Sequence, residues 1–213
     1  MNFEQLLHIV GDEPVFETGL LLAGEVDPDR VRRQLSRWVR AGRLYRLRRG
    51  LYALAPPYRK ASPHPFLIAN RLAHGSCVSL QSALAYYGLI PEYVPLITSV
   101  TTGRPGRRET PLGAFEFRHL KPDLLFGYRR LDLGDGQAAF VAVPEKALLD
   151  LVYLTPGGDA PGYLRELRLQ NLEQLDLEAL QRMAARFDRP KVMRAAELLT
   201  ALARAEAEEY ETV

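Results

Sequence analysis

Nine arginine residues lie between residues 30 and 49, and the stretch from Arg30 to Pro91 contains no acidic residue. Folded surfaces usually intersperse both signs of charge, because like charges repel each other. A block of one sign inside a foldable segment therefore indicates a polyanionic partner, with an ordinary solvated basic face as the alternative. The formal net charge of the 213-residue chain is only +2, so its basic character is local.

The first arginines of this block fall on one face of a predicted helix. Asp27 and Pro28 form a good helix start, and Gly42 follows its end near residue 41. A rotation of about 100° per residue gathers the apolar side chains of the segment on one stripe. The opposite side carries the guanidinium groups of Arg30, Arg33, Arg37 and Arg40. Such a helix fits the major groove of DNA, where arginine commonly reads guanine, so these four residues are predicted to recognise DNA.

The segment after this helix has the pattern of a β-hairpin. RLYRLR and GLYALA alternate around Arg49-Gly50, which predicts two strands joined by a tight turn. Arg46, Arg48 and Arg49 would lie on this hairpin or at its tip, where a wing meets backbone phosphate or a minor groove. We therefore expect all three to contact DNA.

The order of the predicted elements is that of a winged helix-turn-helix. A helix over residues 2–10 and a second short helix over 15–23, closed by Gly24, precede the arginine helix and the hairpin. We predict that residues 1–60 form a DNA-binding domain of this kind.

Residues 61–213 are predicted to form a second domain. Prolines at 56, 57, 63 and 65 interrupt the pattern and mark the boundary. Two helices, over about 65–74 and 79–88, should precede a small antiparallel sheet, and further helices should run from Pro144 to the C-terminus. The expected strands are Leu96–Thr102, Ala114–His119, Tyr128–Leu133 and Ala138–Val143, with Gly103–Thr110 as a turn. The predicted fold class is thus α/β (α+β): a winged helix-turn-helix plus a mixed domain with a small sheet flanked by helices.

Residues with reactive side chains do not have the spacing of a catalytic or metal site. The histidines are not spaced as metal ligands, Cys77 has no second cysteine, and no glycine-rich phosphate loop is present. Ser79 is interpreted as a helix cap, and Lys146 and Asp150 as a surface pair four residues apart. We therefore expect no enzymatic activity, no cofactor and no metal.

Sequence features relevant to the cellular compartment agree with one another. A lone cysteine excludes an intramolecular disulfide and favours a reducing cytoplasm. MNFEQLLHIV lacks the pattern of a secretion signal, and the longest apolar runs fall far short of the ~20 residues that span a membrane. A soluble cytoplasmic protein without a membrane partner is predicted.

Four segments resemble the AbiEi-type antitoxins of abortive phage-infection systems, in the order of that family. They are LSRWVRAGRLYRLRRGLYAL, VSLQSALAYYGLIPE, TSVTTGRPGRRETPLGAFEFRHL and AVPEKALLDL. The resemblance implies a type IV toxin–antitoxin partner, a nucleotidyltransferase toxin encoded nearby. It also implies repression of the protein's own operon through the N-terminal module, with two copies on an inverted repeat of operator DNA. The remainder of the chain would counter the toxin.

The sequence leaves the role of one segment and two alternative functions open. Arg104, Arg107 and Arg108 form a second basic loop that either extends the DNA surface, meets an acidic patch on the toxin, or is simply solvated. The chain is alternatively a regulator whose second domain senses a ligand, without any toxin. A third possibility is an enzyme that modifies the toxin, although the sequence contains no nucleophile–base motif.

Overall fold

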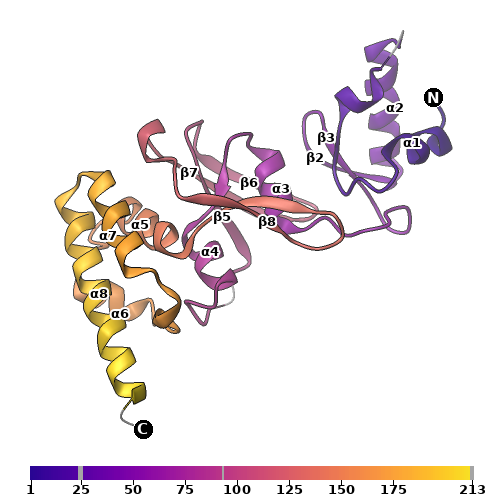
Figure 1. Cartoon of the computed structure of the whole chain (residues 1–213). Coiled ribbons are helices and arrows are strands. Elements are labelled where there is room, and N and C mark those ends of the chain that lie inside the picture. The colour runs from indigo at the N-terminus through magenta and orange to yellow at the C-terminus, as the bar shows by residue number, and fades with distance from the viewer. Residues whose placement is uncertain (24–25, 93, 212–213) are drawn as a thin grey trace.

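The structure is a computed structural model that describes residues 1–23, 26–92 and 94–211, the last three without their side chains. The molecule is elongated, with the two termini at opposite ends (Figure 1). An N-terminal module lies at one end, a second sheet occupies the middle, and a pair of helices forms the other end.

The N-terminal module combines helices with a small sheet. Its elements are α1 (Phe3–Val10), β1 (Phe16–Glu17), a 3-10 turn η1 (Thr18–Leu21), α2 (Pro28–Arg40), β2 (Leu44–Arg48) and β3 (Leu51–Leu54). The strands pair in the order β1-β3-β2, and both pairs are antiparallel. The predicted hairpin, the helix predicted over residues 2–10 and the arginine helix are thus confirmed.

Local signals account for α2. The Asp27 carboxylate accepts a hydrogen bond from the Asp29 amide at 2.9 Å, Pro28 occupies the first helical position, and Gly42 adopts a φ of +69° just beyond the helix. Val31, Leu35 and Trp38 form its buried stripe. The helix therefore begins and ends where the sequence predicts, and it buries the predicted face.

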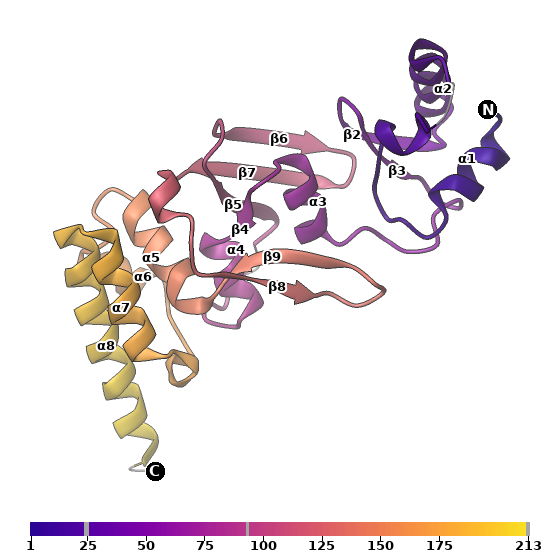
Figure 2. The same ribbon diagram turned by 45° about the horizontal axis from the view of Figure 1, so that its top comes forward.

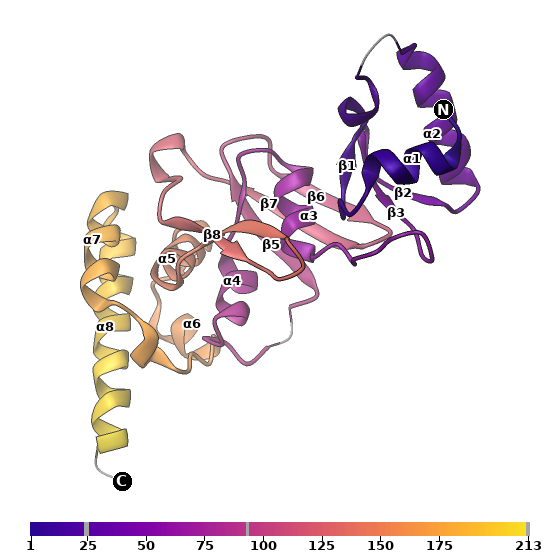
Figure 3. The ribbon, with the colours of Figure 1, turned by 45° about the vertical axis from the view of Figure 1, so that its right-hand side comes forward.

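The helix predicted over residues 15–23 is wrong. Phe16 and Glu17 pair with the hairpin strand β3, and the Thr18 amide donates to Gly50 O at 2.9 Å (Figure 3). A single 3-10 turn follows, and Gly24 lies outside the described residues. Pairing with a strand more than thirty residues away overrides the local helical pattern. The order α1-β1-η1-α2-β2-β3 still corresponds to a winged helix, with the second helix reduced to one turn.

The second module is built on a larger sheet than predicted. In the described part of the chain its strands are β4 (Cys77–Val78), β5 (Leu96–Thr101), β6 (Gly106–Thr110), β7 (Gly113–His119), β8 (Tyr128–Asp132) and β9 (Ala138–Ala142). They form a six-stranded sheet in the order β6-β7-β5-β4-β9-β8. The sheet is mixed rather than antiparallel, because β5 pairs with β7 and β4 with β9 in parallel.

Part of the predicted turn over 103–110 is the edge strand β6. It pairs with β7, so that Arg107 lies opposite Glu116 and Arg108 opposite Phe115. Residues 106–109 are all exposed, which removes the apolar alternation that marks a strand in sequence. A charged edge strand of this kind also discourages pairing with other chains.

Helices cover the sheet and extend beyond it (Figure 2). They are α3 (Pro65–Leu72), α4 (Leu80–Tyr86), α5 (Pro144–Leu154), α6 (Pro161–Glu166), α7 (Leu177–Phe187) and α8 (Pro190–Glu211), with 3-10 turns at Pro122–Leu124 and Leu172–Gln174. Helix α5 packs against α4 and also against α7 and α8, so it is enclosed by other helices. None of the helices within the described ranges is long and apolar enough to cross a membrane.

The surface pair predicted for Lys146 and Asp150 is wrong, because both side chains are buried. Lys146 is 1% exposed and Asp150 0%, and the Lys146 ammonium donates to the Asp150 carboxylate. Ser79 occupies the N-cap position of α4, as predicted, but its hydroxyl donates to the other carboxylate oxygen of Asp150 at 2.8 Å and makes no capping hydrogen bond. Burial raises the pKa of Asp150, while the neighbouring ammonium opposes that shift. The helices packed around α5 bury a pair that its own sequence suggests is solvated.

Candidate nucleic-acid interface

All four arginines predicted on α2 are exposed. Arg30, Arg33, Arg37 and Arg40 project from the side opposite its buried stripe. Arg33 approaches Asp27 at 3.7 Å, but both side chains are more than half exposed, so this ion pair constrains the guanidinium only weakly. Most of this helix lies away from the second module (Figure 1), although Pro111 of the β6–β7 turn lines a hollow together with Arg40. The row is therefore accessible to a large ligand.

A compact apolar core holds α2 in place. Leu6 of α1 and Leu35 of α2 are fully buried in a cluster that also contains Leu44 and Leu54 of the hairpin strands. The ring of Trp38 contacts Phe3 edge to face, with centroids 5.3 Å apart. The arginine row is thus presented by a rigid helix, as groove recognition requires.

The hairpin contributes two exposed arginines. Arg46 lies on β2 opposite Tyr52, and Arg49 lies at the turn beside Gly50, whose φ is +82°. A wing presents cations to the DNA backbone in this way. Both side chains are therefore accessible to a ligand.

Arg48 is placed differently from the other predicted residues. Its side chain is only 23% exposed and binds the Glu17 carboxylate at 3.0 Å and the Arg71 carbonyl at 3.2 Å. It also lies 2.9 Å from the His74 ring. Arg48 therefore joins the hairpin to β1 and to the end of α3. Its partners lie 23 to 31 positions away, so nothing in the local sequence distinguishes it from Arg46 or Arg49.

The second basic segment lies beside the N-terminal module. Strand β6 contacts β2, and Pro111 in the β6–β7 turn lines a hollow of about 500 Å³ together with Arg40 and Arg46. Arg107 and Arg108 are exposed on β6, and Arg107 pairs with Glu109 at 3.2 Å. The basic residues of the two modules therefore lie along neighbouring strands.

Four potentially reactive side chains, Ser79, Cys77, Lys146 and Asp150, are buried in the described part of the chain. Ser79, Lys146 and Asp150 form a buried cluster with no opening to solvent. Burial raises the pKa of the Cys77 thiol to about 12, which keeps it protonated and unreactive. No group of three or more potential metal ligands occurs within 1–23, 26–92 and 94–211.

Comparison with known proteins extends only to the fold. No protein-family model matches the chain, and no curated protein matches it significantly. Among solved structures, the chain is similar to the crystal structure of the RV2827C protein from Mycobacterium tuberculosis. The match covers 94% of this chain and 76% of that one, with a TM-score of 0.58 and 20% sequence identity. The similar fold thus extends over both modules.

Proposed function

We propose that the protein binds duplex DNA, with α2 in the major groove and the β2–β3 hairpin on the adjacent backbone. The observation that carries this proposal is the exposed row Arg30, Arg33, Arg37 and Arg40 on a helix whose opposite face is locked into a winged-helix core. Arg46 and Arg49 supply the wing contacts. Phosphate contacts release counterions, so binding should weaken steeply with salt.

We further propose that the DNA is the operator of the protein's own operon. A single winged module makes few base contacts, and two copies on an inverted repeat would supply the missing specificity. The position of β6 beside β2 favours a DNA surface that continues onto Arg107 and Arg108. An extended footprint of this kind would lengthen the protected region beyond that of an isolated winged helix.

The antitoxin role is part of the same proposal and rests on the resemblance in sequence. Three of the four similar segments fall on β4–α4, on β5–β7 and on β9–α5 of the second module. That module is then the part that counters a nucleotidyltransferase toxin. Co-expression of the full chain with the neighbouring nucleotidyltransferase gene tests this, with restored growth as the expected result and unrelieved toxicity as the contrary one.

Arg33→Ala/Arg37→Ala tests the DNA proposal. The double variant should lose at least tenfold in affinity for a duplex carrying the region upstream of its gene, measured by gel shift at low salt. Arg165→Ala/Arg204→Ala is the matched control, because it also removes two exposed cations, from the distant helices α6 and α8. Full affinity in the first variant, with an unchanged circular dichroism spectrum, would show that α2 does not enter the groove.

A further inference from the structure

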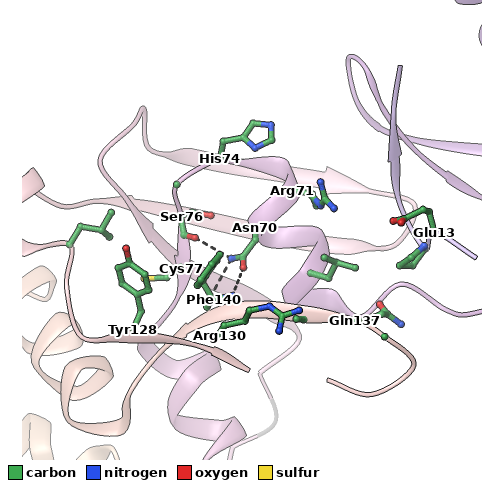
Figure 4. Close-up of a pocket in the computed structure, with 16 residues that line it drawn as sticks. Glu13, Asn70, Arg71, His74, Ser76, Cys77, Tyr128, Arg130, Gln137 and Phe140 are labelled. Carbon is green, nitrogen blue, oxygen red and sulfur yellow. Dashed lines mark hydrogen bonds between the residues drawn. The ribbon is translucent and has the colours of Figure 1, made fainter. Parts of the chain in front are cut away.

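A cleft of about 590 Å³ lies where the N-terminal module meets the central sheet (Figure 4). Glu13 and Pro14, which follow α1, form one wall. Helix α3 and the β8–β9 hairpin form the others. A volume of this size falls in the range of small-molecule sites.

Basic side chains line the cleft from two sides. Arg71 and His74 come from the end of α3 and the turn after it, and Arg130 comes from β8. Arg71 and Arg130 are exposed, and neither guanidinium forms an ion pair within the described part of the chain. Glu13 is the one carboxylate among the lining residues. The cleft is thus suited to an anionic group.

Two aromatic rings are exposed in the same cleft. Tyr128 is 45% exposed and Phe140 47%, and their centroids lie 5.8 Å apart in an edge-to-face contact. Arg130 lies directly opposite Phe140 in the β8–β9 pair, so the cation and the rings share one face of the hairpin. Exposed rings beside arginine form a platform on which a planar base stacks.

Two amide side chains that line the cleft, those of Asn70 and Gln137, are already hydrogen-bonded within the fold. The Asn70 amide bonds both the Phe140 amide at 2.6 Å and the Ser76 carbonyl at 3.2 Å. The Gln137 side chain bonds the backbone of Ser62 and His64 at 3.0 and 2.8 Å. These bonds hold α3 and its preceding segment against β9 and the turn before it, so the walls of the cleft are preformed.

We propose that this cleft binds a nucleoside phosphate. Its phosphate would meet Arg71 and Arg130, and its base would stack on Tyr128 and Phe140. The wall formed by Glu13 belongs to the DNA-binding module, and the Arg48–Arg71 contact lies beside the cleft. A nucleotide bound in the cleft would therefore affect the contact between the two modules. This site is separate from the DNA surface on α2.

The test is calorimetric titration of the full chain with the four ribonucleoside triphosphates. At least one triphosphate should bind. Its nucleoside alone and inorganic phosphate alone should each bind with at least tenfold lower affinity than that triphosphate. Arg71→Ala, Arg130→Ala and Phe140→Ala should each weaken binding tenfold or more. Arg129→Ala is the matched control, because the neighbouring residue on β8 contacts Tyr87 instead of lining the cleft.

Three results of these titrations would overturn the proposal. They are no binding of any triphosphate at millimolar concentration, inorganic phosphate binding as tightly as the triphosphates, and equal weakening by Arg129→Ala. Tighter binding of a single-stranded oligonucleotide than of every mononucleotide would also contradict it, because the site would then be a strand groove. Unchanged nucleotide binding in Arg33→Ala/Arg37→Ala would separate this site from the DNA proposal, so either can fail alone.

Discussion

At the scale of single residues, burial decides what a charged side chain contributes. Lys146 and Asp150 are four positions apart on α5, a spacing that at an exposed site is worth only a few tenths of a kcal/mol. Here the pair is enclosed, and the ammonium also lies 4.9 Å from the ring centroids of Phe126 and Phe187. Removing one partner would leave a buried charge without compensation, which is far more costly than losing a surface pair.

Lys146→Met should therefore lower the free energy of unfolding by about 3 kcal/mol, measured by urea denaturation. Lys146→Met/Asp150→Asn should lose less than the sum of the single changes, because it removes both charges. Arg182→Ala breaks the exposed pair with Glu178 on α7 and is the control, expected within about 0.5 kcal/mol of the parent. A loss below about 1 kcal/mol in Lys146→Met would contradict the buried ion pair.

Cys77 should make stability fall above pH 9. Burial raises the pKa of its thiol from 9.0 to about 12, so the unfolded chain releases this proton first as pH rises. The stabilisation is complete below pH 9 and is lost between pH 9 and 12. The difference in unfolding free energy between the parent and Cys77→Ala should shrink by about 1.4 kcal/mol from pH 8 to pH 10. A constant difference would mean that the thiol is not perturbed.

At the scale of secondary-structure elements, α2 and β6 illustrate two kinds of specification. The boundaries and faces of α2 follow from its own residues, with Asp27 as its cap. Strand β6 exists because it pairs with β7, and its exposed residues carry no strand pattern. Elements of the first kind are predictable from a sequence, whereas elements of the second kind depend on a partner.

The cap of α2 is open to a direct test. Asp27→Ala should lower the free energy of unfolding by about 1 kcal/mol, because the Asp29 amide loses its acceptor. Asp27→Asn keeps an oxygen that can accept this hydrogen bond, so its free energy of unfolding should stay close to that of the parent. If the two variants were equally unstable in urea, charge rather than the capping hydrogen bond would be responsible.

At the scale of the whole molecule, the two modules share an interface and do not pack independently of each other. The larger apolar core contains Val15, Leu47 and Leu51 of the N-terminal module together with Phe66 and Leu67 of α3. Arg48 adds polar contacts across the same junction. The module that contains α2 is therefore joined to the sheet by both apolar and polar contacts.

Arg48→Met should destabilise this junction without removing a DNA contact. Loss of its hydrogen bonds to Glu17 and Arg71 should cost about 2 kcal/mol, seen as a lower Tm and as faster proteolysis between residues 57 and 64. Operator affinity should fall much less than in Arg33→Ala/Arg37→Ala. An equal loss of affinity at unchanged stability would instead place Arg48 on the DNA.

Long-range partners explain where sequence-based expectations were wrong. The 15–23 segment has helical periodicity, yet pairing of Phe16 with Tyr52 makes its start a strand. The sheet was expected to be antiparallel because strand patterns do not reveal which strands become neighbours. Six of the seven arginines assigned to DNA are exposed, and the exception is the one with distant partners, Arg48.

By itself, the sequence determined the α+β class, the arginine helix with its cap and stripe, and the hairpin that follows it. Each of these depends on residues within about one helix or hairpin of each other, so local periodicity and capping chemistry suffice. Only the tertiary structure decided the mixed strand order, the burial of Lys146 with Asp150, the role of Arg48 and the cleft between the modules. These features arise where segments tens of residues apart come into contact. Whether a side chain is buried or a strand is paired there depends on the distant segment, so local sequence does not reveal it.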